Sequence, residues 1–405
     1  MNVTGIEWTA TIHTDGATTP GFSANPLKYH DKRTGEVVWG CVKKSPGCAH
    51  CYAEQLAKRY GRGGSFTKAE MEHLDPFLDE AELRKMLTAK TVGGVAVSRS
   101  RCFVGDMTDC FGEWVPDALL DRLFAVFAWR ADVTWQVLTK RADRMAAYLN
   151  RPYMPGAVCD AAQKSGWSIV GVDRKEHSEG HYSALTGPTW PLPNVWLGVS
   201  VENQAAADER VPHLLRTPAA VRFLSCEPLL GPVDLSPWLG AEARCPNHPC
   251  VNHKTSEPQN VMRWATCMAC NGAGSVQGVE WVIVGGEGGP GARPMAPAWA
   301  RTLRDQCNAA GVAFFHKQNG EWWGWSQMSD ADKAAVYNPL PPELEYHPDH
   351  RNHNPHVKPH QMVFSGGTIG VGESVYRVGK KAAGRLLDGR TWDEFPAAPA
   401  TVGKE

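Results

Sequence analysis

Short apolar runs that end in turn or polar residues alternate along the chain with stretches whose apolar residues recur at helical spacing. Three of these stretches predict helices, at residues 117–130, 204–215 and 298–310. Seven apolar runs predict strands, at residues 36–41, 101–105, 133–138, 195–201, 220–225, 279–285 and 312–316. Because strands that alternate with helices are typical of parallel sheets, the pattern predicts an α/β fold. We expect a partial TIM-like β/α barrel, with a doubly wound sheet as the alternative.

Three stretches interrupt this alternation and suggest how the chain is divided. Residues 151–193 are rich in Gly, Pro and Ser and predict a loop insertion. Residues 240–278 carry a group of cysteines and predict a small zinc-binding insert. Residues 321–405 begin with a stretch rich in Trp, His and Pro and predict a C-terminal extension. The barrel core is then expected in residues 1–239 and 279–320.

Composition narrows the class of protein. Hydrophobic residues make up 42% of the 405 residues and charged residues 21%, so the chain can bury a core. The formal net charge is -1, so any site for a polyanion must be local. No apolar run approaches the roughly 20 residues of a membrane-spanning helix, and the first residues do not resemble a signal peptide. We expect a cytoplasmic protein with no membrane partner.

Three cysteines follow the first predicted strand, with the spacing C-x6-C-x2-C at Cys41, Cys48 and Cys51. In a reducing compartment, clustered cysteines indicate metal ligands rather than disulfides. Three thiolates can hold three irons of a 4Fe–4S cluster and leave the fourth iron free to bind a ligand, whereas structural zinc requires four protein ligands. The sequence therefore predicts a 4Fe–4S cluster, and a zinc site completed by His50 or another side chain is the alternative.

A second group of cysteines has the spacing C-x4-C-x16-C-x2-C, at Cys245, Cys250, Cys267 and Cys270. Two cysteine pairs at this separation are typical of tetrahedral zinc sites, so we expect a structural Zn ion there. A second iron–sulfur cluster is the alternative. The five histidines between residues 347 and 360 stand among Pro and Asn and predict a solvated loop.

Polar residues follow most of the predicted strands. In a β/α barrel the catalytic groups lie at the C-terminal ends of the strands, so these residues should meet at one rim. The candidates for catalysis are Asp106, Lys140, Glu202, Glu227 and Lys317. The candidates for binding a cofactor are Ser200, Gly285, Gly286 and Glu287. Carboxylates and lysines around one mouth could bind the charged groups of a ligand, or could form ion pairs among themselves.

Nine segments also carry a family resemblance. They are residues 40–54, 103–109, 136–141, 193–203, 223–230, 281–287, 314–318, 378–384 and 387–396. In these segments the chain resembles the phage-encoded three-Cys-motif proteins, a family that looks like a branch of the radical S-adenosylmethionine (SAM) enzymes. The resemblance covers most of the chain apart from the insertions.

The resemblance implies that a 4Fe–4S cluster cleaves SAM and that the resulting radical abstracts hydrogen from a substrate held over the barrel mouth. The phage setting implies a nucleic-acid base or nucleotide as the substrate, as in DNA modification in the host cytoplasm, and a partner protein could take part. In radical SAM enzymes a Gly-Gly-Glu motif receives the methionine amine, so Gly285, Gly286 and Glu287 are expected to bind SAM. The alternative is a non-catalytic zinc-binding phage accessory protein that binds nucleic acid or a host partner.

Overall fold

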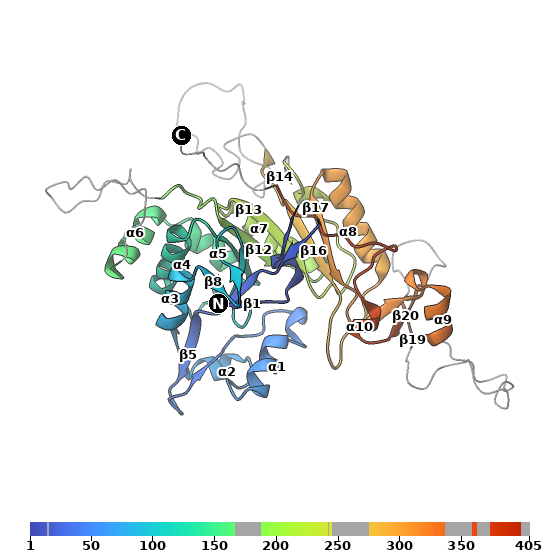
Figure 1. The fold of residues 1–405 in the computed structure, drawn as a ribbon, viewed down its shortest axis with the longest axis horizontal. Coiled ribbons are helices and arrows are strands. Elements are labelled where there is room, and N and C mark those ends of the chain that lie inside the picture. Colours follow the sequence, from blue (N-terminus) through green and yellow to red (C-terminus); the bar gives the residue numbers. More distant parts are fainter. Residues whose placement is uncertain are drawn as a thin grey trace, which may run out of the picture.

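A computed structural model describes residues 1–13, 16–166, 188–241, 243–244, 275–336, 359–362 and 373–397. Its centre is an eight-stranded sheet with the spatial order β1-β4-β10-β11-β12-β13-β16-β17 (Figure 1). These strands span Asn2–Val3, Phe22–Ala24, Arg101–Val104, Thr134–Thr139, Val195–Ser200, Val221–Cys226, Trp281–Gly285 and Ala313–Gln318. Only β1 runs antiparallel to its neighbour, so the sheet is mostly parallel and the α/β prediction is confirmed.

Six of the seven predicted strands correspond to β10, β11, β12, β13, β16 and β17. The prediction for residues 36–41 is wrong, because only β6 (Val37–Val38) forms there, and it pairs with β5 (Leu27–Asp31) outside the central sheet. The strand beside β10 is β4, whose three residues are too few to show a pattern. Among the described residues the pairing leaves β1 and β17 at opposite edges of the sheet.

Helices connect the parallel strands and pack their apolar faces on the sheet to form the main core. They are α4 (Asp117–Trp129), α5 (Ala142–Leu149), α6 (Met154–Lys164), α7 (Gln204–Arg216) and α8 (Pro297–Ala310). Helix α6 corrects the prediction of a loop over residues 151–193. Its buried residues Met154, Val158, Ala161 and Ala162 recur at helical spacing and join this core.

Aromatic side chains fill the opposite face of the sheet. Trp8, in the short 3-10 helix η1 (Glu7–Thr9), is buried against Phe103 of β10, with ring centroids 4.7 Å apart. The same indole lies 6.2 Å from Phe223 of β13 and 6.2 Å from Trp281 of β16. These rings occupy the sheet face below the carboxyl ends of the strands, where Ser200 and Ser225 are paired in register.

The segment between β4 and β10 forms a separate layer, which carries the first cysteine group. Strands β5, β6 and β7 (Leu74–Leu78) make a small antiparallel sheet, and β8 (Thr91–Val92) pairs with β9 (Val95–Ala96). The helices of this layer are η2 (Pro46–Cys48), α1 (Tyr52–Arg59), α2 (Lys68–Met71) and α3 (Glu80–Thr88). In Figure 1, α1, α2 and β5 lie together below the central sheet.

The C-terminal extension contains a three-stranded antiparallel sheet in the order β18-β20-β19. Its elements are β18 (Trp322–Gly324), η4 (Trp325–Gln327), α9 (Asp330–Val336), β19 (Pro359–Met362), β20 (Glu373–Arg377) and α10 (Lys380–Ala383). Beyond α10 the chain returns to the core, where Trp392 packs on Phe314 and Phe395 packs on Trp281. Within the described residues, no helix has both the length and the apolarity needed to cross a bilayer.

The remaining short elements flank the insert and the N-terminus. They are β2 (Thr11–Ile12), β3 (Thr18–Thr19), η3 (Ser236–Trp238), β14 (Ala243–Arg244) and β15 (Ser275–Val276). Strands β14 and β15 pair with each other. The zinc ligands expected at Cys245, Cys250, Cys267 and Cys270 lie outside the described residues, as do four of the five clustered histidines.

Candidate functional site

The loop that carries Cys41, Cys48 and Cys51 runs from β6 to the start of α1. All three thiols are free and partly exposed. Burial raises the pKa of Cys41 to about 12, the negative charge of Asp109 adds to this shift, and Cys51 and Cys48 make smaller additions. Among the described residues, no group of three or more His, Cys, Asp or Glu side chains is arranged to hold a metal ion.

The donors around the sulfur atoms suit thiolate ligands. The backbone N–H of Lys44 donates to Cys48 Sγ at 3.5 Å. Burial raises the pKa of Cys51, although backbone N–H groups of Glu54 and Ala53 donate to its sulfur and oppose the shift. Because metal ligation requires the thiolate form, binding a cluster or ion here would release protons. Three cysteine sulfurs are the donor type that iron–sulfur clusters use, although the described side chains are not arranged around a metal position.

Glu202, two residues after the end of β12, holds this cysteine loop against the central sheet. Its carboxylate accepts hydrogen bonds from the Ser45 hydroxyl and from the backbone N–H of Gly47, the latter at 3.3 Å. A side chain at position 47 would place its Cβ 2.7 Å from Glu202 Oε1, so glycine permits this close approach. The loop between Cys41 and Cys48 is thus fixed at the carboxyl end of β12.

Two cations compensate the buried charge of Glu202. Arg210 of α7 donates to Oε2 at 2.7 Å, and Lys140 Nζ lies 3.8 Å from Oε1. Burial alone would raise the pKa of Glu202, but the charges of Lys140 and Arg210 and the hydrogen bond from Ser45 hold it below its usual value. The side chains of Glu202 and Arg210 are only 1% and 2% exposed, so this ion pair belongs to the interior.

A second buried arginine, which lies between the end of β11 and the start of α5, holds the same loop. Arg141 donates to the carbonyl oxygen of Val42 at 2.8 Å, to Asp109 at 3.1 Å and to Glu113 at 2.8 Å. Asp109 also accepts hydrogen bonds from the Thr139 hydroxyl at 2.7 Å and from a backbone N–H at 3.1 Å. Asp109, like Asp106, follows β10 and was a strand-end candidate in the sequence, whereas Arg141, directly after the candidate Lys140, was missed.

One sequence signal could have identified Arg210. It lies on the apolar stripe of α7, together with the buried residues Ala206, Ala207, Val211 and Leu214. A charged residue on such a stripe is buried with the stripe and therefore requires a partner. For Arg141 we find no comparable signal, because its position beside Lys140 suits an exposed basic pair equally well.

Asp106, two residues after the end of β10, lies beside Tyr52, the first residue of α1. The Tyr52 hydroxyl donates to the backbone carbonyl of Asp106 at 2.5 Å, and the Asn25 amide donates to its carboxylate. Burial raises the pKa of Asp106, and the hydrogen bond from Asn25 only partly opposes the shift. A carboxyl group with a raised pKa at a strand end is suited to proton transfer.

Replacing Asp106 with asparagine is expected to stabilise the protein above neutral pH. A carboxyl group whose pKa is raised by folding makes the protein less stable as the pH rises through that pKa. An amide does not ionise, so it removes this loss of stability. We expect the melting temperature of Asp106→Asn to exceed that of the wild type by about 2 °C at pH 8, and the difference to shrink towards pH 4. Thermal unfolding across this pH range measures it; a difference independent of pH would contradict the assigned cause.

Glu227 and Lys317 form an ion pair at the carboxyl ends of β13 and β17. Lys317 Nζ at the end of β17 lies 3.0 Å from the Glu227 carboxylate, which follows β13. The Ser225 hydroxyl donates to the same carboxylate at 3.3 Å. Between these strands, a Cβ at Gly285 would lie 2.7 Å from Glu227 Oε1, so this glycine makes room for the carboxylate. Ser200 lies beside Ser225 in the sheet register and is buried.

Glu287 lies near the cysteine loop, but its carboxylate is already bound. It accepts hydrogen bonds from Arg293 at its Nε (2.8 Å), Nη2 (2.6 Å) and backbone N–H (2.8 Å). Burial opposes ionisation, yet the hydrogen bonds from Arg293 hold the pKa of Glu287 below its usual value, with a smaller contribution from His50. A side chain at Gly286 would collide with the carbonyl oxygen of Asn319, so Gly286 serves backbone packing.

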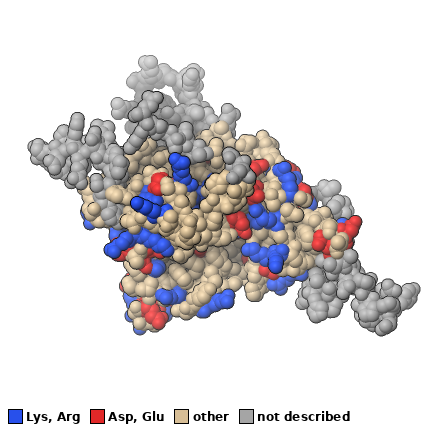
Figure 2. Space-filling view, in the orientation of Figure 1, with Lys and Arg blue, Asp and Glu red and all other residues tan. Residues whose placement is uncertain are grey.

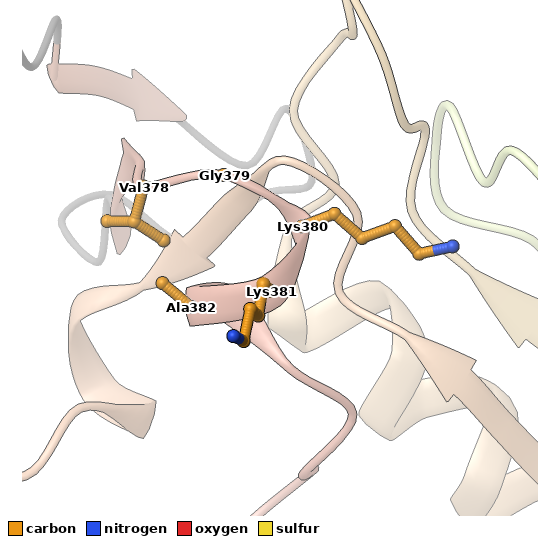
Figure 3. Close-up of a pocket in the computed structure, with 5 residues that line it drawn as sticks. All are labelled: Val378, Gly379, Lys380, Lys381 and Ala382. Atoms are coloured by element: carbon orange, nitrogen blue, oxygen red, sulfur yellow. The ribbon is translucent and has the colours of Figure 1, made fainter.

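The turn at residues 378–382 lies against the glycine-rich loop at residues 285–291, which contains Glu287. A Cβ at Gly288 would lie 3.9 Å from the side chain of Lys380. Figure 3 shows an open hollow lined by this turn, with Lys380 and Lys381 extended in different directions. Figure 2 shows acidic and basic residues interspersed over the face in view, without an extended surface of a single charge among the described residues.

The structure thus brings the strand-end candidates and the first cysteine loop to one edge of a parallel sheet. These features define the class of protein as α/β chains that carry a three-cysteine loop at the carboxyl ends of their parallel strands. Residues 26–396 match the model of a family described as "Protein of unknown function (DUF5131)", and the chain belongs to this family. A search of curated proteins and a search of solved structures each found no match.

Proposed function

We propose that the chain is a radical SAM-type enzyme that uses a 4Fe–4S cluster to generate a radical on a nucleic-acid base or nucleotide, as in phage DNA modification in the host cytoplasm. The observation that carries this proposal is the attachment of the cysteine loop to the sheet. Glu202 binds the loop at Ser45 and Gly47, and Arg141 binds it at Val42. The three thiols are thereby held over the strand ends, where β/α barrels carry their catalytic groups.

We further propose that the central sheet is a partial TIM-like barrel. From β4 to β17 the strands follow one another in space as they do in sequence, without the reversal of a doubly wound sheet. Trp8 contacts rings on β10 and β16, although three strands lie between them. A single side chain reaches both strands more readily if the sheet is curved around it, which supports the barrel.

In this proposal Cys41, Cys48 and Cys51 hold the cluster, which when bound would supply the electron that cleaves SAM. Glu287 and Arg293 form an ion pair near His50, and such a pair complements the ammonium and carboxylate groups of the methionine part of SAM. Lys140, Glu227 and Lys317, together with the Ser200 and Ser225 hydroxyls, would orient the polar groups of the substrate. Asp106 would hold or release a proton at its carboxyl group.

Anaerobic reconstitution tests the proposal. The full chain is incubated with ferrous iron and sulfide, desalted, and analysed for iron, sulfide and visible absorption. We expect about four irons per chain and a broad absorption near 400 nm, as is typical of 4Fe–4S proteins, and about one zinc that remains in the insert. Protein that binds only zinc after this treatment would reject the radical mechanism and favour the alternative of a zinc-binding accessory protein.

A further inference from the structure

Tyr52 presents an exposed aromatic ring beside the cysteine loop. It follows Cys51 directly and is the first residue of α1, and 51% of the residue is exposed. Its hydroxyl donates to the carbonyl oxygen of Asp106 at 2.5 Å. The hydrogen bond fixes the hydroxyl end of the ring at the end of β10, and the backbone of α1 fixes the end that carries Cβ. The ring is therefore held in one orientation although much of it is open to solvent.

The contacts of Tyr52 place its ring at the carboxyl edge of the central sheet. Cys51 precedes Tyr52 in the chain, and the carbonyl oxygen that accepts from its hydroxyl belongs to Asp106, which follows β10. Glu202 holds the cysteine loop at the end of β12 through Ser45 and Gly47. Tyr52 thus lies beside the cysteine loop and at the end of β10.

We propose that Tyr52 is a stacking platform for the planar ring of a nucleobase at this mouth. An aromatic ring held at both ends loses little conformational entropy when a base stacks on its open face, and every base offers a π-face to stack. The inference rests on the proposed function in taking the mouth as the ligand site. The adenine of SAM and the base of a nucleotide substrate share this chemistry, and the experiment below distinguishes them.

Calorimetric titration of the full chain with SAM, and separately with thymidine 5′-monophosphate, tests the platform. Tyr52→Leu keeps an apolar side chain but removes the ring, and we expect it to weaken binding of at least one probe about tenfold. Tyr52→Phe keeps the ring and should weaken binding less. The matched control is Tyr60→Leu, because Tyr60 lies at the other end of α1, is 62% exposed and has no hydrogen bond to a strand end among the described contacts.

A change confined to SAM assigns the platform to the adenine, and a change confined to the nucleotide assigns it to the substrate. Unchanged affinities in Tyr52→Leu, equal losses in Tyr60→Leu, or no binding of either probe by the wild type would overturn the inference. Photo-crosslinking of the wild type with 5-bromo-2′-deoxyuridine 5′-monophosphate, mapped by mass spectrometry, gives a second readout for the nucleotide if Tyr52→Leu does not fold.

The two proposals can fail separately. If reconstitution yields no iron–sulfur cluster but a probe still binds through Tyr52, the radical mechanism is rejected and the platform stands. If the cluster forms and neither probe depends on Tyr52, the platform is rejected and the radical mechanism stands.

Discussion

Cys48→Ala is expected to reduce the iron bound after anaerobic reconstitution from about four atoms per chain to less than about one. With three protein ligands there is no spare thiol in the loop, so loss of one leaves two irons without protein coordination. Cys48 lies at the end of η2, where its side chain accepts only a weak hydrogen bond from Lys44 at 3.5 Å. Its removal should therefore change metal content without unfolding the chain.

Cys159→Ala is the matched control for this experiment. Cys159 is also free and partly exposed, but it belongs to α6 on the helical side of the sheet. We expect the iron content and visible absorption of the Cys159→Ala variant to equal those of the wild type. If Cys48→Ala retains the full iron content, or if both variants lose iron alike, the assignment of the cluster to the loop at residues 41–51 is wrong.

Glu202→Ala is expected to lower the free energy of unfolding by about 3 to 5 kcal/mol, because it leaves the buried guanidinium of Arg210 without its carboxylate. The Ser45 hydroxyl and the Gly47 N–H lose their acceptor in the same variant. Urea unfolding monitored by fluorescence measures the first effect. The rate of alkylation of Cys48 measures the second, and it should rise because the loop is released.

Glu209→Ala provides the comparison on the same helix. Glu209 is 52% exposed and lies 3.7 Å from Lys44 and 3.8 Å from Arg210, so its ion pairs are largely solvated. Removal of such a partner changes stability by at most about 1 kcal/mol. Equal destabilisation by the two variants would show that burial of Glu202 does not produce the effect. An unchanged alkylation rate in Glu202→Ala would show that it does not hold the loop.

Much of the central sheet was predictable because its strands are buried on both faces. β12 and β16 are buried at every residue, and such continuous apolar runs are typical of parallel strands. β4 was not predictable because three residues are too few to show a periodic pattern. The run at residues 36–41 suggested a strand of the central sheet because it contains adjacent valines, but the strand that forms there is only two residues long. Helix α6 was missed because the Pro and Gly around it are typical of loops.

The site was predictable only in part. The rule that catalytic groups follow parallel strands located Lys140, Glu202 and Glu227. The contacts that hold the cysteine loop were not predictable, since Ser45 and Glu202 are separated by 157 positions and no local pattern links them. Glu287 was expected to be free for a ligand, and its ion pair with Arg293 depends on how the glycine-rich loop turns back, which spacing alone does not determine.

The position of Trp8 has a consequence for how the chain folds during synthesis. The indole of Trp8 packs on Trp281, which is made 273 positions later. Until β16 and β17 have left the ribosome, the aromatic face of the growing sheet has no complete covering. Contacts this distant in sequence form slowly, and the exposed aromatic surface promotes aggregation meanwhile. Chains truncated before residue 281 should therefore accumulate as insoluble protein, although most of the parallel strands are already present.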